Sequence, residues 1–300
     1  MLAEIETRFL NGDSVAKHFD LIAGTSTGGI IALGLAHGLK GRDVQKFYLE
    51  RGDKVFSNPN SAVRAWRWMR RWHRNAYSNY ALEQELLNIF GDSSLGEAQT
   101  RLCIPSFEGV HGEPWIYKTP HHPDYKKDRV EWMVKVALAT SAAPTYFRAM
   151  PNNGYVMVDG GIWANNPVMN AVTDAMTCFE IDRSQIRVLS LGCGETAFKV
   201  DAARAAGGLL QWKDVIRAAM RAQSHNALGQ SWLLLGKENV LRLDVSESSN
   251  PIPMDDHRRA KAELPGAARS LVEAAGHQIQ RMFLADLTTP YEPCPLKPNK

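Results

Sequence analysis

The chain has 300 residues, 44% of them hydrophobic, and a formal net charge of +3. This length allows a large buried core, and the chain carries no repeats or low-complexity tracts, which excludes a fibrous or largely disordered protein. We expect one globular domain over residues 1–285 and a C-terminal tail over residues 286–300. The weak net charge argues against a nucleic-acid partner.

The sequence carries no signal for export or membrane insertion. No apolar stretch reaches membrane-spanning length, and the opening MLAEIE is acidic where a signal peptide is positively charged. We therefore expect a cytoplasmic protein, with peripheral contact at the inner membrane face left open. The four cysteines lack C-x-x-C spacing, which argues against a disulfide framework and a zinc site. They are Cys103, Cys178, Cys193 and Cys294.

The first predicted element with chemical meaning spans residues 19–31, FDLIAGTSTGGII. An apolar strand leads into G-x-S-x-G and then into a helix of small residues, which is the pattern of a nucleophile elbow. We expect glycines at both ends of the turn because Cβ atoms would collide where strand and helix cross. Ser26 is then the candidate nucleophile, and free N–H groups of the helix, that of Thr27 first, can stabilise an oxyanion. A structural turn is the alternative. The elbow comprises Gly24, Thr25, Ser26, Thr27 and Gly28.

A helix is predicted from Gly41 through Tyr48, and residues 64–74 after it have the most unusual composition in the chain. If these residues are helical, the arginines occupy one arc and the tryptophans the rest. Such a helix suits a membrane interface, and a surface helix that packs its tryptophans on the core is the alternative. The candidate membrane contacts are Arg64, Trp66, Arg67, Trp68, Arg71, Trp72 and Arg74.

Strands and helices alternate through the rest of the chain. Strands are predicted at 102–104, 115–117, 155–158, 186–191 and 240–243, and helices at 130–142, from 167 onward, at 211–228 and at 267–284. This alternation predicts an α/β fold, a three-layer sandwich with a mostly parallel central sheet. Active sites in such sheets gather at the carboxyl ends of strands, where Ser26 and Asp159 both fall.

Ser26 needs a base, because a serine hydroxyl is a poor nucleophile at neutral pH. Asp159 follows a predicted strand and precedes Gly160 and Gly161, whose lack of side chains leaves the carboxylate approachable. The D-G-G sequence on its own is often a turn, so that alternative stays open.

Histidines offer a second source of a base. A hydrolase triad would need a late histidine, and the chain offers His225, His257 and His277, each of which also fits a structural role. His121 and His122 are adjacent and would face opposite ways on a strand, so we expect no metal site from this pair.

Three ordered motifs resemble those of the patatin-like phospholipases: GTSTGG at 24–29, ATSAAPTYF at 139–147 and VDGGIWANNP at 158–167. The resemblance covers most of the chain. It implies a patatin-like fold and hydrolysis of fatty-acyl esters of phospholipids or lysophospholipids by a serine–aspartate dyad. Carried onto this chain, Ser26 is the nucleophile, and Asp159 accepts its proton and later activates water. No metal or organic cofactor is implied.

The start of the chain departs from the family pattern. Family members begin with a strand and a glycine-rich loop, D-G-G-G-x-R-G, that forms the oxyanion hole, and the sequence lacks this loop. Loss of one oxyanion donor typically costs about 10²–10³ in rate. We expect an N-terminally incomplete domain, with an apolar strand and G-G-G upstream of Met1. A natural short form that binds lipid without turnover is the alternative.

A narrower resemblance concerns regulation. The segment HFDLIAGTSTG and the following AHG are similar to bacterial patatin-like effectors that cyclic nucleotides switch on in anti-phage defence. This implies a cyclic-nucleotide activator, although housekeeping members carry closely similar stretches and the sequence has no nucleotide-binding fingerprint. The sequence predicts no particular oligomeric state.

Overall fold

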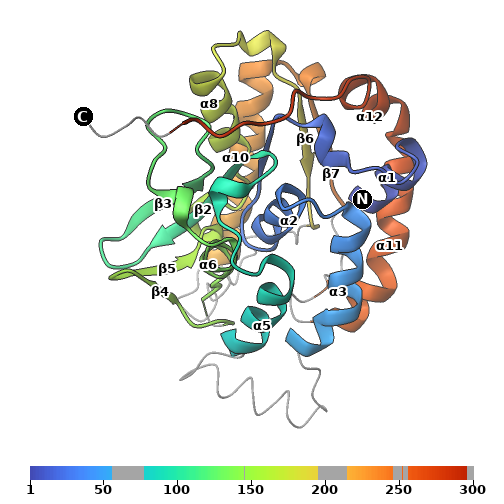
Figure 1. The fold of residues 1–300 in the computed structure, drawn as a ribbon. Helices are drawn as coiled ribbons and strands as arrows, with labels where there is room; N and C mark the ends of the chain where they lie inside the picture. Colours follow the sequence, from blue (N-terminus) through green and yellow to red (C-terminus); the bar gives the residue numbers. More distant parts are fainter. Residues whose placement is uncertain (56–77, 145, 195–214, 246–251, 253–255, 296–300) are drawn as a thin grey trace, which may run out of the picture.

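The computed structural model describes residues 1–55, 78–144, 146–194, 215–245, 252 and 256–295 (Figure 1). Strands and helices alternate along much of this chain, as predicted. The strands are β1 (Leu21–Ala23), β2 (Arg101–Glu108), β3 (Glu113–Lys118), β4 (Met150–Asn152), β5 (Tyr155–Asp159), β6 (Val188–Leu191) and β7 (Val240–Leu243). The helices are α1 (Leu2–Phe9), α2 (Thr27–Ala36), α3 (Gly41–Val55), α5 (Asn79–Phe90), α6 (Met133–Thr140), α7 (Gly161–Ala164), α8 (Val168–Cys178), α10 (Val215–Leu235), α11 (His257–Ala274) and α12 (Gly276–Phe283).

The described strands form a five-stranded sheet and a two-stranded sheet. The larger sheet has the order β1-β2-β5-β4 with β3 also on β2, and the smaller one joins β6 to β7. Pairing is parallel in the β1–β2 and β6–β7 ladders, as expected. It is antiparallel where β2 meets β3, where β2 meets β5 and where β4 meets β5. The α/β class is confirmed, with an antiparallel extension on one side of the larger sheet.

Strands β1 and β5 lie end to end along one edge of β2. Strand β3 pairs with β2 from Cys103 to Glu108 and so fills the other edge. Strand β1 pairs with Arg101–Cys103 and β5 with Ser106–Glu108, and a strand has only two edges. Since β1 is parallel and β5 antiparallel to β2, their carboxyl ends face each other. We expected the two predicted catalytic segments to meet at the carboxyl ends of parallel strands. They meet instead because β5 runs antiparallel to β2.

Helices cover both faces of the β6–β7 pair and complete three layers. Figure 1 shows α1, α3, α11 and α12 on one side of this pair and α8 with α10 on the other. Alternate side chains point to each layer: Leu191 and Leu243 pack toward α1 and α12, whereas Val188 and Val240 pack toward α8 and α10. In the larger sheet, β2 packs on α2 and α6 through residues such as Ile104, and α5 adds to the same core against α6.

A buried carboxylate joins α1 to α3. Glu6 is 1% exposed, and its oxygens accept hydrogen bonds from the N–H groups of Val15, Gly41 and Arg42. Two of these donors are at the N-terminus of α3, where helix geometry leaves N–H groups without intrahelical partners and the helix dipole favours negative charge. Glu6 thereby holds α3 beside the start of the chain.

The C-terminal segment from residue 286 to 295 lies across the domain. The N–H and hydroxyl of Thr288 both donate to the carbonyl of Lys17, at 2.9 and 3.0 Å. Farther along, the N–H of Cys294 donates to the carbonyl of Pro120 at 2.8 Å. Figure 1 shows this red segment passing from α12 toward the loop after β3. The part of the predicted tail that the structure describes is therefore anchored at two points.

Candidate active site

Ser26 occupies a strained turn between β1 and α2. Its φ of 58° and ψ of −125° are rare for a residue with a side chain. A Cβ on Gly24 would lie 2.1 Å from the carbonyl oxygen of Gly28, so the first glycine is required. The expectation for Gly28 itself is wrong, because a Cβ there would meet no atom within 4 Å outside the neighbouring backbone of its own helix. The second close approach is at Gly29, whose Cβ would lie 2.7 Å from Cγ2 of Thr140.

The predicted pair of Ser26 and Asp159 meets at the facing ends of β1 and β5. The Ser26 hydroxyl donates to Oδ2 of Asp159 at 2.6 Å, and the N–H of Gly161 donates to Oδ1 at 2.7 Å. Asp159 is only 5% exposed. This burial raises the pKa of its carboxyl group to about 6, although the two hydrogen bonds act in the opposite direction. The group is therefore ionised at neutral pH and still basic enough to receive a proton.

Thr140, at the end of α6, fills the gap between β1 and β5. Its hydroxyl oxygen accepts from the N–H of Ser26 at 3.0 Å, and the hydroxyl donates to the carbonyl of Pro105 at 2.6 Å. Pro105 lies in the stretch of β2 between the residues that pair with β1 and those that pair with β5. Proline has no backbone N–H to donate, and on this edge no strand of the described chain is present to accept such a hydrogen bond. A Cβ on Gly160 would lie 2.4 Å from the same carbonyl oxygen. One short piece of β2 thus positions both sides of the site.

The two threonines of the elbow have different roles. The Thr25 hydroxyl is buried and donates to the carbonyl of Ala164 at 2.7 Å, which ties the elbow to α7. Thr27 is exposed and is the first residue of α2. The N–H of Gly28 is bonded to the carbonyl of Thr25 at 2.9 Å. The N–H of Thr27, at the positive end of the helix dipole, remains the candidate donor to an oxyanion.

The late histidines do not complete a triad with this pair. His257, at the start of α11, places Nε2 2.7 Å from the backbone carbonyl of Tyr48. His225 and His277 lie within α10 and α12. In the described part of the chain, none of the three is hydrogen-bonded to either side chain of the pair. The geometry therefore favours direct proton transfer from serine to aspartate.

Membrane contact through the arginine- and tryptophan-rich segment stays a prediction. Its residues fall within 56–77, outside the part of the chain that the structure describes: Arg64, Trp66, Arg67, Trp68, Arg71, Trp72 and Arg74. None of the described helices is both long enough and apolar enough to cross a bilayer.

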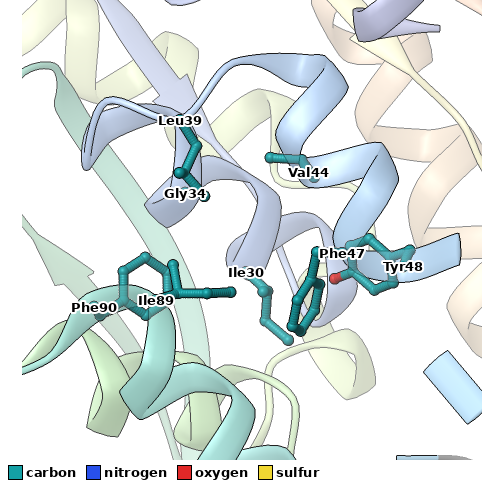
Figure 2. Close-up of a pocket in the computed structure, with 8 residues that line it drawn as sticks. All are labelled: Ile30, Gly34, Leu39, Val44, Phe47, Tyr48, Ile89 and Phe90. Carbon is teal, nitrogen blue, oxygen red and sulfur yellow. The ribbon is translucent and has the colours of Figure 1, made fainter. Parts of the chain in front are cut away.

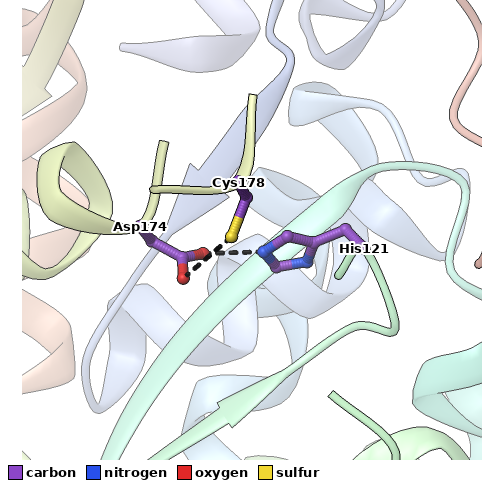
Figure 3. Close-up of side chains that lie close together, drawn as sticks. All are labelled: His121, Asp174 and Cys178. Carbon is purple, nitrogen blue, oxygen red and sulfur yellow. Dashed lines mark hydrogen bonds and ion pairs between the residues drawn. The ribbon is translucent and has the colours of Figure 1, made fainter. Parts of the chain in front are cut away.

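A second buried polar cluster escaped the sequence analysis. Figure 3 shows His121, from the loop after β3, pointing toward Asp174 and Cys178 on α8. The imidazole Nε2 lies 2.7 Å from Oδ2 of Asp174, and both side chains are at most 1% exposed. These three residue types bind metals, and among the described residues they are the group whose ligand atoms all lie within 4.8 Å of one another. The only signal in the sequence is that Asp174 and Cys178 are four residues apart on one helix. His121 is 53 positions from Asp174, so its place in the cluster could not be read from the sequence.

Protein donors already occupy the carboxylate of this cluster. The ammonium of Lys118 and the hydroxyl of Tyr125 both donate to Oδ1 of Asp174, at 2.5 and 2.7 Å. Although burial alone would raise the pKa of Asp174, the hydrogen bonds from His121, Lys118 and Tyr125 lower it to about 2. A cation would have to displace the ammonium group. We therefore interpret the cluster as an ion-pair network that joins β3 and its following loop to α8.

Comparison with known proteins finds relatives in one family. The family model for patatin-like phospholipases matches residues 2–172. A cGAMP-activated phospholipase from Pseudomonas aeruginosa is 30% identical over 297 residues, covering 97% of this chain and 86% of that protein. A cGAMP-activated phospholipase from Vibrio cholerae is 34% identical, covering 64% of this chain and 59% of that protein. Patatin-like protein 2 from Arabidopsis thaliana is 33% identical, covering 70% and 59%.

The family match extends over more than half of the chain, from residue 2 to residue 172, and includes both the Ser26 elbow and Asp159. The match to the Pseudomonas protein extends over nearly the whole chain, whereas the other two matches span about three fifths of the relatives' length. The chain therefore belongs to the patatin-like phospholipase family.

Proposed function

We propose that this protein is a lipid acyl hydrolase that cleaves fatty-acyl esters of phospholipids or lysophospholipids through a Ser26–Asp159 dyad. The observation that carries the proposal is the 2.6 Å hydrogen bond from the Ser26 hydroxyl to a buried carboxylate. The family supports a phospholipid as the class of substrate.

In the first half-reaction, Ser26 Oγ attacks the ester carbonyl carbon while Oδ2 of Asp159 takes the hydroxyl proton. The carbonyl oxygen becomes an oxyanion, which the N-terminus of α2 and the N–H of Thr27 stabilise. Collapse of this intermediate breaks the ester C–O bond, and the alcohol leaves with the proton from Asp159. This alcohol is a lysophospholipid when the substrate is a phospholipid and a glycerophosphodiester when the substrate is a lysophospholipid. An acyl-enzyme ester on Ser26 remains.

In the second half-reaction, a water molecule replaces the departed alcohol. Asp159 takes a proton from this water as its oxygen attacks the acyl carbon, and the bond to Ser26 Oγ breaks. The serine oxygen recovers the proton, and the fatty acid leaves. The same carboxylate acts as base and acid in turn, a role for which a pKa of about 6 is suited near neutral pH.

We also propose that a cyclic dinucleotide activates the enzyme. Relatives in Pseudomonas aeruginosa and Vibrio cholerae are named cGAMP-activated phospholipases, and the first of them aligns with 97% of this chain. Activation of this kind requires that the nucleotide binds the active conformation more tightly than the resting one. The expected readout is a rise in acyl release when cGAMP is added.

The test measures fatty-acid release from phospholipid vesicles, with and without cGAMP. Ser26→Ala and Asp159→Asn should each abolish the release, because they remove the nucleophile and the base. Two exposed positions provide matched controls, Ser270→Ala on α11 and Asp286→Asn after α12, and should leave release unchanged. Release that survives either dyad substitution would refute the mechanism. Vesicle binding without release that depends on Ser26 would instead favour a lipid-binding module.

A further inference from the structure

The segment that follows Asp159 is a single helical turn, so other parts of the chain must fix it. Helix α7 has 4 residues, and a helix shorter than about 12 residues is marginal on its own in water. Its first N–H, that of Gly161, donates to Oδ1 of Asp159 at 2.7 Å. Its last carbonyl, that of Ala164, accepts from the hydroxyl of Thr25 at 2.7 Å. Helix α7 is therefore bonded both to Asp159 and to the residue before Ser26, and a shift of this turn would change how the two side chains of the dyad meet.

The two sides of the dyad are supported in different ways. Helix α2, which carries Ser26, is held by apolar packing: Figure 2 shows Ile30 beside Phe47 of α3 and Ile89 of α5, around a small apolar gap. Of the residues of α7, only the small Gly161 and Ala164 are buried. Polar contacts must therefore supply much of the support on the Asp159 side.

Two residues of α10 contact the segment from α7 to its following loop. Met220 and Gln223 are three positions apart and so lie on one face of α10. The methyl carbon of Met220 lies 3.1 Å from the position that a Cβ on Gly161 would take. Oε1 of Gln223 accepts from the N–H of Asn166 at 2.9 Å, and Nε2 donates to the carbonyl of Asn166 at 3.2 Å. One side-chain amide thus bonds both backbone groups of Asn166.

Asn166 links α7 to α8 in a site with little access to water. It is 6% exposed, and its Oδ1 accepts from the N–H of Val168, the first residue of α8, at 3.2 Å. Its Nδ2 is buried and has no hydrogen-bond partner among the described residues. Backbone N–H and C=O groups that are buried without a partner are rare in folded proteins. Loss of the Gln223 amide would therefore force Asn166 to find other partners, and α7 would move with it.

We propose that Gln223 is a positioning residue for the dyad: by holding Asn166 from α10, it fixes α7 and thereby the geometry in which Asp159 meets Ser26. This inference rests on the proposed function, in which Asp159 receives a proton in both half-reactions. Misplacement of a reacting group by about 1 Å can cost about hundredfold in rate. The role belongs to the amide of Gln223, because only a group that both donates and accepts satisfies the two backbone groups of Asn166.

The experiment measures hydrolysis of 4-nitrophenyl butanoate, a soluble ester, by the intact protein at a temperature where each variant is folded. Gln223→Ala should lower kcat at least about tenfold and leave KM within about twofold, because both half-reactions use Asp159 and slow together. The matched control is Gln230→Ala at an exposed position of the same helix, which should leave both constants unchanged. An unchanged kcat in Gln223→Ala, or a change confined to KM, would overturn the inference.

A second variant keeps the test decisive if Gln223→Ala does not fold. Gln223→Met has nearly the same length and helix propensity as the wild type and loses only the amide group. It should lower kcat as Gln223→Ala does. A wild-type kcat in Gln223→Met would contradict a role for the amide.

Crystal structures of the wild type and Gln223→Met give a readout that needs no turnover. The distance between Ser26 Oγ and Asp159 Oδ2 is 2.6 Å and should lengthen beyond about 3.2 Å in the variant. If no ester is hydrolysed but this distance lengthens, the proposed function fails and the role of Gln223 stands. If hydrolysis depends on Ser26 but the distance and kcat are unchanged, the role of Gln223 fails and the proposed function stands.

Discussion

The buried charge of Asp159 should destabilise the folded protein at neutral pH, so removing it should stabilise the fold while abolishing activity. In Asp159→Asn the amide oxygen still accepts from the N–H of Gly161, and the amide nitrogen donates to Ser26 Oγ. A folded-state pKa of about 6 against an ordinary value of 3.8 is a difference of about 2 units. At about 1.4 kcal/mol per unit, the difference in free energy is about 3 kcal/mol.

The direction of this shift fixes the pH window. Between about pH 4 and pH 6 the folded wild type holds a proton that the unfolded chain releases, so its free energy of unfolding falls as the pH rises. Asp159→Asn has no carboxyl group to titrate at this position. The difference in free energy of unfolding between this variant and the wild type should therefore grow in favour of the variant by about 3 kcal/mol from about pH 4 to pH 7. Urea unfolding of both proteins across this range measures this difference. A difference in the free energy of unfolding that does not change with pH would show that the pKa of the Asp159 carboxyl group is not shifted in the folded protein.

Further substitutions test the elbow at Gly24, the positioning of Ser26 by Thr140, and the ion-pair network around Asp174. Gly24→Ala should cost about 3 kcal/mol or more, because its Cβ would lie 2.1 Å from a backbone oxygen, whereas Gly28→Ala should change stability by no more than about 1 kcal/mol. Thermal unfolding compares the two, and equal losses would contradict the elbow geometry. Thr140→Val removes a buried hydroxyl that bonds two backbone groups, so it should lower kcat at least about tenfold with little change in KM, and Thr140→Ser should restore most of it. A change confined to KM would count against this role. Asp174→Asn leaves the Lys118 ammonium without its charged partner and should cost about 3 kcal/mol at neutral pH. The pKa of Asp174 lies below its ordinary value, so the wild type should lose this stability as the pH falls from about 4 to 2, and urea titration should show no such loss in the variant.

The sequence predicts the two side chains of the proposed dyad because each belongs to a local pattern. Ser26 stands in a strand–turn–helix signature, and Asp159 ends a strand before two glycines. The sequence also predicts strand β7 at its observed bounds, and the α/β class follows from the alternation of elements. Such features depend on neighbours in the chain, so one sequence is enough to find them.

Features that depend on distant neighbours could not be predicted. The direction of β5 is set by its pairing with β2, and the steric requirement at Gly29 rather than Gly28 is set by Thr140, which lies on another helix. The role of the Thr140 hydroxyl could not be predicted either. The ATSAAP motif contains this residue but does not show which backbone groups its hydroxyl contacts. His121 and Asp174 are brought together only by the packing of α8 against the loop after β3.

In the proposed mechanism, Ser26 and Asp159 react as one unit. The rate at which a short-chain fluorophosphonate labels the protein, followed by intact mass and peptide mapping as a function of pH, tests it most directly. We expect one adduct per chain, on Ser26, with a labelling rate that is half-maximal near pH 6 and falls at least about hundredfold in Asp159→Asn. Labelling at another residue, or a rate unchanged in Asp159→Asn, would contradict it.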